Sequence, residues 1–211
     1  FMIQVEIWSD FVCPFCYIGK RNFEKAVAQL GNKDQVEVTF RSFELDPNAQ
    51  VRPKGSIYES LAKKYGKTVE WAIQANQQVT QTAKAIGLTY NMDQVVPTNS
   101  FDAHRLAHMS RKIGKNDLVQ ELVMTAYFTD GKDISDHTVL KSIGVQVGLK
   151  ETEIQAMLDS EDFKNEVRQE EDMARDIGVS GVPFFVFNRK FAVSGAQPPE
   201  AFIEAFDEVE L

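Results

Sequence analysis

Cysteine is scarce in this sequence, and an excess of positive charge and long apolar runs are both lacking. Lys and Arg total 23 against 31 Asp and Glu, which gives a net charge of −8 at neutral pH. A chain of that charge repels phosphate backbones, so we expect no nucleic-acid partner. No run of roughly 18 apolar residues is present to span a bilayer, and Met2 is followed by no basic segment with an apolar core. We therefore expect no membrane partner and a mature chain that begins at Met2 in the cytoplasm.

Glycine and proline are also few. The chain has 12 Gly and 7 Pro among 211 residues, with 43% hydrophobic and 26% charged residues. These proportions are typical of a globular protein and exclude collagen-like and disordered chains. At roughly 100 to 200 residues per domain, the length predicts one large domain or one domain that carries an insertion.

The two cysteines, Cys13 and Cys16, are separated only by Pro14 and Phe15. A disulfide between them would close a very short loop, and the stabilisation that a disulfide gives grows with the length of the loop. The pair is therefore not expected to be a structural crosslink. Three interpretations follow: inert buried thiols, metal ligands or a redox-active pair.

Hydrophobic periodicity places this pair at the start of a helix. Apolar residues alternate with polar ones over 3–7, which predicts a strand. Apolar residues at helical spacing over 23–30 predict a helix, and a second alternation over 36–41 predicts another strand. Pro14 fits a first helical turn, because its missing N–H would have no partner there. The sequence thus predicts a strand, a helix with Cys13 at or near its N-terminus, and a second strand.

The middle of the chain has helical periodicity, whereas the end returns to strands. Between residues 46 and 176 we predict helices at 56–65, 68–86, 99–113, 117–129, 136–147 and 151–177. After Gly178 we predict a hairpin of strands 184–187 and 191–193 with a turn at 188–190, and then a helix at 199–209. A helical block of this length is too long for a loop. The expected fold class is α/β: residues 1–45 and 177–211 form one discontinuous domain, and residues 46–176 form an all-helical insertion.

The predicted position of the cysteines favours redox chemistry. A thiol at a helix N-terminus lies beside unpaired N–H groups and the positive end of the helix dipole, which stabilise a thiolate. The thiolate is the form of cysteine that attacks disulfides. Cys13, at the end of the strand, is the expected nucleophile. Cys16, one turn into the helix, is the expected resolving thiol that attacks a mixed disulfide.

Zinc binding is the main alternative chemistry. Cys13 and Cys16, together with His104 and His108, supply the ligand types and short spacings of a zinc site. The gap between the two pairs is far longer than in a compact zinc finger, and a chain of this length needs no metal to fold. We therefore expect no metal and interpret both histidines as ordinary helix residues. Arg105 follows His104 where a metalloprotease motif requires Glu, so the sequence excludes that class.

Four separated segments carry a family resemblance. They are SDFVCPFCYIG at 9–19, FELDP at 43–47, NSFDAHR at 99–105 and VSGVPF at 179–184. With this set, the sequence resembles the DsbA-like thioredoxin-fold family over nearly its full length, and within it the FrnE-type branch of cytoplasmic thiol–disulfide oxidoreductases. The resemblance implies a thioredoxin fold with a large helical insertion, and a redox-active cysteine pair that needs no organic cofactor.

The resemblance also implies roles for individual residues. Pro183 matches a cis-proline packed beside the cysteines, and the backbone of Val182 is expected to pair with bound peptides. Pro14 and Phe15 are expected to support the site; Phe15 stands where DsbA itself carries His, which weakens the expectation of a strong oxidant. Asp10, three residues before the first cysteine, is expected either to relay a proton or to cap the helix.

Other proteins of this fold offer a second enzymatic alternative. Kappa-class glutathione transferases and 2-hydroxychromene-2-carboxylate isomerases act on glutathione adducts and usually lack the cysteine pair. Because both cysteines are present, we expect a thiol–disulfide oxidoreductase, or a disulfide isomerase, that acts on proteins or small molecules with thiols or disulfides, with glutathione as a candidate co-substrate. A glutathione-dependent isomerase or transferase and a zinc-stabilised binding module are the alternatives. The oligomeric state and the direction of electron flow stay open.

Overall fold

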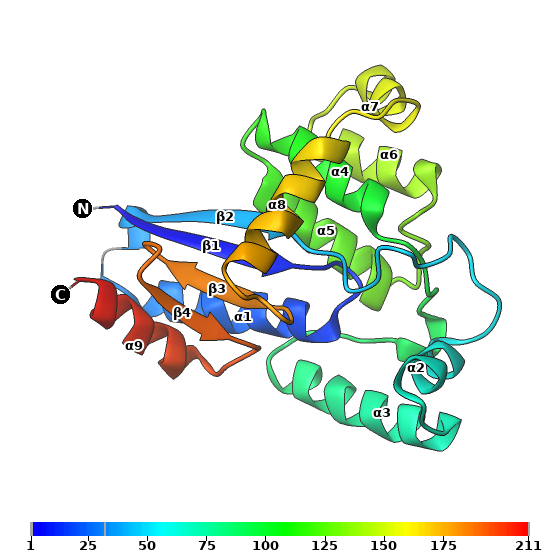
Figure 1. Cartoon of the computed structure of the whole chain (residues 1–211), viewed down its shortest axis with the longest axis horizontal. Coiled ribbons are helices and arrows are strands. Elements are labelled where there is room, and N and C mark those ends of the chain that lie inside the picture. The colour runs from blue at the N-terminus through cyan, green and yellow to red at the C-terminus, as the bar shows by residue number, and fades with distance from the viewer. Residues whose placement is uncertain (1, 32, 211) are drawn as a thin grey trace. The chain divides into compact units, whose positions relative to one another are not determined.

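The chain divides into two compact units in the computed structural model, which describes residues 2–31 and 33–210. One unit consists of residues 1–45 and 167–211, and the other consists of residues 46–166. The first contains a four-stranded sheet, and the second contains helices α2 to α7 (Figure 1). The discontinuous α/β unit and the helical segment between its halves give the architecture that the periodicity predicts.

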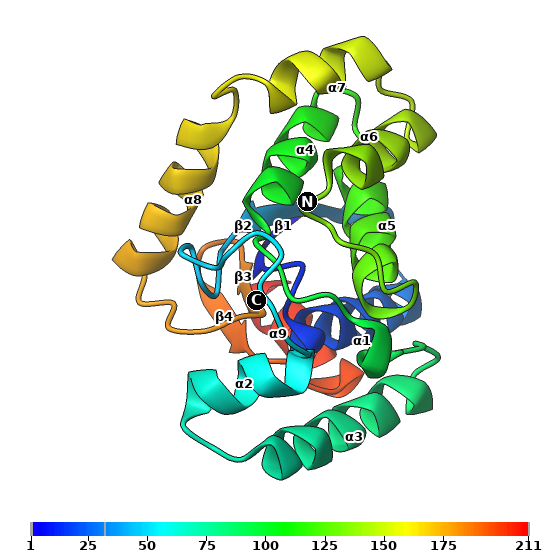
Figure 2. The same cartoon turned by 90° about the vertical axis from the view of Figure 1, so that its right-hand side faces the viewer.

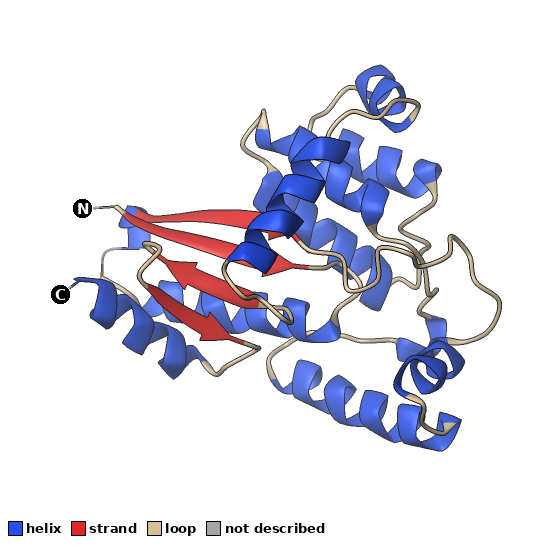
Figure 3. Cartoon of the chain, in the orientation of Figure 1, coloured by secondary structure: helices blue, strands red, loops and turns tan. Residues whose placement is uncertain are grey.

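The sheet of the first unit is mixed and has the order β2-β1-β3-β4 (Figure 3). Strand β1 (Ile3–Ser9) pairs in parallel with β2 (Val36–Ser42) and antiparallel with β3 (Phe184–Phe187). Strand β4 (Phe191–Ser194) pairs antiparallel with β3 and completes the predicted hairpin. Helix α1 (Pro14–Gln29) and the 3-10 turn η1 (Lys33–Gln35) connect the two parallel strands, so the predicted strand–helix–strand unit is confirmed.

The hairpin turn follows from two residues with left-handed backbone. Asn188 and Arg189 have φ angles of 48° and 54°, as the two central positions of the tight turn from Phe187 to Lys190 require. The N–H of Lys190 donates to the carbonyl of Phe187 at 2.9 Å and closes the turn. Gln4 exchanges two hydrogen bonds with Asn188 at 2.8 Å each, which fastens the turn to β1. The turn predicted at 188–190 is therefore confirmed.

Alternation along the strands divides the sheet into two faces. One face contributes the apolar residues that pack against α1 and the final helix α9 (Pro199–Glu210). Phe23 of α1 lies at the centre of this core, with ring centroids 5.6 Å from Phe185, 5.7 Å from Phe202 and 6.0 Å from Phe206. Aromatic contacts thus fix α1, and with it the segment that carries the cysteines, against the sheet.

The opposite face is covered by helix α8 (Lys164–Asp176), which passes in front of the sheet in Figure 1. Trp8 of β1 packs against Ala174, and its indole N–H donates to the carbonyl of Glu170 at 2.9 Å. Arg41 of β2 pairs with Glu6 at 2.7 Å and with Glu170 at 2.9 Å. The predicted boundary at 176/177 is therefore wrong, because α8 packs on the sheet and the α/β unit resumes at residue 167.

The second unit contains the predicted helices, several of which begin at residues that cap them. Its elements are α2 (Ile57–Tyr65), α3 (Val69–Ala85), the 3-10 turn η2 (Met92–Gln94), α4 (Phe101–Arg111), α5 (Asn116–Phe128), α6 (His137–Gln146) and α7 (Glu151–Leu158). Ser56, Thr68 and Asp136 cap α2, α3 and α6 with their side chains. Helices α2 and α3 pack side by side (Figure 2). Among residues 2–31 and 33–210, no helix has the length and apolar character needed to cross a membrane.

The single helix predicted over 151–177 is wrong, because the structure has two helices there. Helix α7 ends at Leu158, and α8 begins at Lys164 after Phe163, whose φ is 64°. The guanidinium of Arg105 in α4 donates hydrogen bonds to the carbonyls of Met157, Ser160 and Asp162. In a continuous helix these carbonyls would accept from backbone N–H groups of the next turn. The break therefore depends on a buried cation that lies 52 to 57 residues earlier in the chain.

Candidate functional site

The segment that leaves β1 places Cys13 at the N-terminus of α1. Cys13 is the N-cap of the helix, with extended backbone (φ −91°, ψ 113°), and Pro14 follows at the first helical position. The N–H of Cys13 donates to the carbonyl of Asp10 at 3.2 Å, and the N–H of Cys16 donates to the carbonyl of Cys13 at 3.1 Å. These two turns orient both cysteines on the same end of the helix.

The two thiols are free and differ in their surroundings. Cys13 is 3% exposed, and its Sγ donates to the carbonyl of Val182 at 3.6 Å. Cys16 is 1% exposed, and its Sγ accepts from the backbone N–H of Asp10 at 3.5 Å. Burial raises the pKa of the Cys16 thiol well above its usual value, and the hydrogen bond and charge of the neighbouring Cys13 raise it further. The second thiol is therefore held in its protonated form.

The segment before β3 forms the other wall of the site. The peptide bond between Val182 and Pro183 is cis. Pro183 is buried, and its carbonyl accepts from the N–H of Gly195 at 2.9 Å. Because proline has no N–H to give to the sheet, its position directly before the strand costs no ladder bond. Phe15, between the two cysteines, is 49% exposed and offers an apolar surface beside the thiols.

Asp10 fastens the segment between β1 and the cysteines to the end of β2. Its side chain is 1% exposed, and Oδ2 accepts from the backbone N–H of Leu45 at 2.8 Å. Leu45 belongs to the FELDP segment, in which the buried Glu44 is paired with Arg168 of α8. The geometry therefore gives Asp10 a role in holding the loop that carries Cys13.

The NSFDAHR segment holds the helical unit together. The Asn99 side chain accepts from the N–H of Phe101 at 2.8 Å and donates to the carbonyl of Ala49 at 2.9 Å. His104 and His108 are buried on α4, with 2% and 6% of their surface exposed. In the described part of the chain, no group of three or more His, Cys, Asp or Glu side chains is arranged to hold a metal ion. The four candidate zinc ligands thus form no such cluster there.

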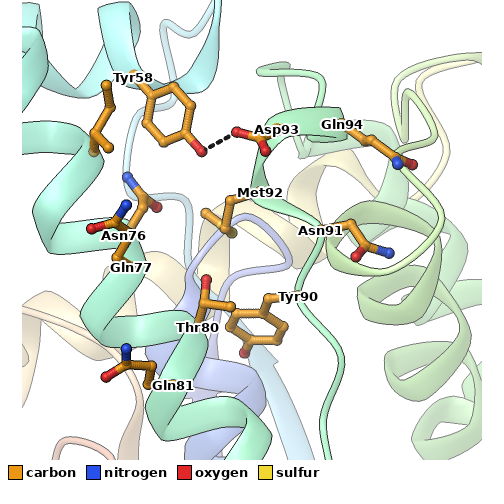
Figure 4. A pocket seen from close by; sticks show the side chains of 11 residues that line it. Tyr58, Asn76, Gln77, Thr80, Gln81, Tyr90, Asn91, Met92, Asp93 and Gln94 are labelled. Carbon is orange, nitrogen blue, oxygen red and sulfur yellow. Dashed lines mark hydrogen bonds between the residues drawn. The ribbon is translucent and has the colours of Figure 1, made fainter.

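The helical unit has an open groove of about 670 Å³ between α3 and the segment 90–94 (Figure 4). Carboxamides and hydroxyls line most of it, and none of the predicted site residues does. At one end, the hydroxyl of Tyr58 donates to Asp93 at 2.5 Å. Burial and this hydrogen bond raise the pKa of Tyr58 to about 12. The groove therefore presents a polar surface whose acidic side chain, Asp93, is bonded to the Tyr58 hydroxyl.

Sequence reasoning did not single out Gly19, which lies one turn after Cys16 and directly against Pro183. A glycine inside a helix lowers helix stability relative to alanine, so a glycine at this position indicates a packing or functional requirement. This was the signal in the sequence that could have identified Gly19. Gly195 donates its backbone N–H to the carbonyl of Pro183, and no sequence pattern predicts this contact.

Comparisons with known proteins identify the family of this chain. The profile of the family described as DSBA-like thioredoxin domain matches residues 4–207. A probable DsbA oxidoreductase from Streptomyces coelicolor is 38% identical, and the match covers 98% of this chain and 89% of that one with a TM-score of 0.93. The cytosolic disulfide reductase DsbM from Pseudomonas aeruginosa shares the fold, at 15% identity over 98% of both chains and a TM-score of 0.67.

A curated relative extends the match to a third organism. The uncharacterized protein YwbO of Bacillus subtilis is 26% identical over 208 residues, which are 98% of this chain and 96% of that protein. The family profile spans both halves of the α/β unit and the helical unit between them. This chain therefore belongs to the family of DSBA-like thioredoxin domains.

Proposed function

We propose that the protein is a dithiol–disulfide oxidoreductase in which Cys13 is the nucleophile and Cys16 the resolving thiol. The main support is the unequal placement of two neighbouring thiols. Cys13 is the N-cap of α1, where the helix dipole favours an anion, whereas Cys16 lies one turn further in and is held protonated by burial. Such an arrangement separates the attacking thiol from the thiol that acts second.

The reaction begins when the thiolate of Cys13 attacks one sulfur of a substrate disulfide. The substrate S–S bond breaks, a mixed disulfide forms, and the released thiolate takes a proton from water. Cys16 then gives up its proton and attacks Sγ of Cys13, so that the mixed disulfide breaks and the second substrate thiol leaves. Two electrons and two protons pass to the substrate, and the cysteine pair becomes a disulfide.

The same steps run backwards when the oxidised pair meets a dithiol substrate or a reducing thiol. Two molecules of glutathione, as co-substrate, reduce the pair and leave as one glutathione disulfide. We propose that proteins or small thiols are the substrates, that Val182, Pro183, Pro14 and Phe15 contact them, and that the cysteine pair needs no organic cofactor. We propose the cytoplasm as the compartment, which is supported by the cytosolic relative of the same fold.

The first experiment is a redox titration in graded glutathione buffers. Intact mass after thiol alkylation reports the reduced and oxidised fractions of the cysteine pair, and zinc is assayed on the same sample. We expect a reversible two-electron transition between roughly −270 and −120 mV, the range of characterised proteins of this fold. A protein that exchanges no thiols across this range contradicts the proposal.

Two variants separate the roles of the cysteines. Cys13→Ser is expected to abolish reduction of a model disulfide such as insulin, because no thiol remains to begin the attack. Cys16→Ser is expected to form mixed disulfides that accumulate, because the resolving step is lost. Full turnover by Cys13→Ser, or glutathione-dependent transfer that persists without Cys16, would favour the glutathione-dependent isomerase or transferase instead.

A further inference from the structure

Helix α1 and the segment before β3 approach most closely at Gly19. A methyl group placed on the Cα of Gly19 would lie 2.8 Å from Cγ of Pro183 and 3.4 Å from Cζ of Phe185. Cβ atoms essentially never lie within 3.0 Å of a heavy atom of a residue that is distant in the chain, so any side chain at this position forces a movement. An ordinary contact of 3.4 Å or more from Pro183 requires a displacement of about 0.6 Å.

The helix side of this contact is fixed. Phe23 is enclosed by core aromatic rings, including Phe185 at 5.6 Å. The carboxamide of Asn22 donates to the carbonyl of Gln197 at 3.0 Å and ties the same turn of α1 to the segment before α9. Phe185 is itself paired with Ile7 in the sheet and is fully buried. Neither α1 nor Phe185 can retreat without disturbing the core.

The segment that ends at Pro183 is the part that can move. Residues 179–183 belong to no helix or strand, so few backbone bonds hold them. Because a peptide unit is planar, the carbonyl of Val182 moves together with the proline ring. That carbonyl is the group 3.6 Å from Sγ of Cys13. A displacement that starts at position 19 is therefore transmitted to the first thiol.

We propose that Gly19 is a positioning residue: its missing side chain seats the Pro183 ring against α1 and so holds the Val182 carbonyl over the sulfur of Cys13. The carbonyl oxygen accepts from the thiol and opposes a negative charge on the sulfur. It also helps to keep Cys13 at 3% exposure. Gly19 thereby restrains the reactivity of the nucleophile. The importance of this restraint for turnover depends on the proposed oxidoreductase function, whereas the contact does not.

The test measures alkylation of Cys13 by iodoacetamide at fixed pH. The variants are made in a Cys16→Ser background, so that intact mass reports one thiol. Gly19→Ala is expected to raise the alkylation rate by at least about threefold, because the carbonyl moves away and the sulfur becomes more accessible. Gly31→Ala and Gly181→Ala are the matched controls, since an added methyl there meets no atom within 4 Å. Both are expected to stay within about twofold of the parent rate.

A double variant separates the steric contact from a general effect on the helix. Pro183→Ala removes the Cγ atom that the new methyl would meet, so in that background Gly19→Ala is expected to change the rate less than about twofold. Helix propensity alone would raise the melting temperature of Gly19→Ala without changing alkylation. An unchanged rate in the folded single variant, or equal acceleration in both backgrounds, overturns the inference.

Folding is checked by circular dichroism for each variant. If Gly19→Ala does not fold, the Gly19→Ala/Pro183→Ala variant is expected to recover the native spectrum, and failure to recover it overturns the inference. Alkylation needs no enzymatic turnover. If the parent protein exchanges no disulfide, the proposed function is refuted. If the parent protein exchanges disulfides but Gly19→Ala leaves the alkylation rate of Cys13 unchanged, only the inference about Gly19 is refuted.

Discussion

Replacement of Arg105 by methionine tests whether one buried cation holds the helical unit together. Arg105 is 4% exposed and donates to the carbonyls of Met157, Ser160 and Asp162, and to the carboxylate of Asp102 at 2.8 Å. Methionine keeps most of the volume but removes every donor. Asp102 is partly exposed and keeps His137 at 2.9 Å, so most of the loss comes from the carbonyls of Met157, Ser160 and Asp162. A buried acceptor left without a donor costs about 1–3 kcal/mol, so we expect the free energy of unfolding to fall by about 3–5 kcal/mol.

Arg52 provides the matched control in the same unit. Like Arg105, it forms ion pairs, with Asp133 at 3.0 Å and with Asp136 at 2.9 Å, but its side chain is 64% exposed. Exposed pairs contribute about 0–1 kcal/mol, so Arg52→Met should change the stability little. The assay is urea unfolding followed by circular dichroism; at about 2 kcal/mol per molar urea, the midpoint of Arg105→Met should fall by about 1.5–2.5 M. Equal losses in the two variants would refute the reasoning.

Three further predictions concern titration and the covering of the sheet. In an ultraviolet pH titration, Tyr58 should contribute a phenol with a pKa near 12, whose signal is lost in Tyr58→Phe and moves to lower pH in Asp93→Asn; no change in the titration would contradict the Tyr58 assignment. Because burial raises the pKa of Cys16, the unfolded chain loses this proton first, so stability should fall as pH rises above about 8.5, and the fall should be smaller in Cys16→Ser. Glu170→Gln should lower the free energy of unfolding by about 1–3 kcal/mol, while the exposed Glu166→Gln on the same helix should not; similar urea midpoints would disprove it.

Local pattern was sufficient for most elements of the fold. Alternation of polar and apolar residues identified β1 and β2. Strand β3 is a continuous apolar run because its side chains point in turn to a core on each face of the sheet. Ser56, Thr68 and Asp136 mark helix starts because each side chain accepts a backbone N–H there. These signals lie within a few residues of the feature that they predict.

The errors share one physical cause, which is contact between residues far apart in the chain. The break between α7 and α8 depends on Arg105, and the position of α8 depends on Trp8 and Arg41. Periodicity shows that a helix has an apolar face but not which surface covers that face. Hydrophobic periodicity and Pro14 predicted the thiol pair at the helix start, whereas the approach of Gly19 to Pro183 could be found only in the folded chain.

The discontinuity of the α/β unit has a consequence during synthesis. Strand β1 leaves the ribosome first, but its pairing is complete only when β3, which follows about 180 residues later, has been synthesised. The helical unit between them, residues 46–166, can fold in the interval. At about 5–20 residues per second, translation of that unit takes about 6–24 s. During this time both cysteines belong to an incomplete α/β unit, so the nascent chain exposes to the compartment the thiols that the finished protein buries.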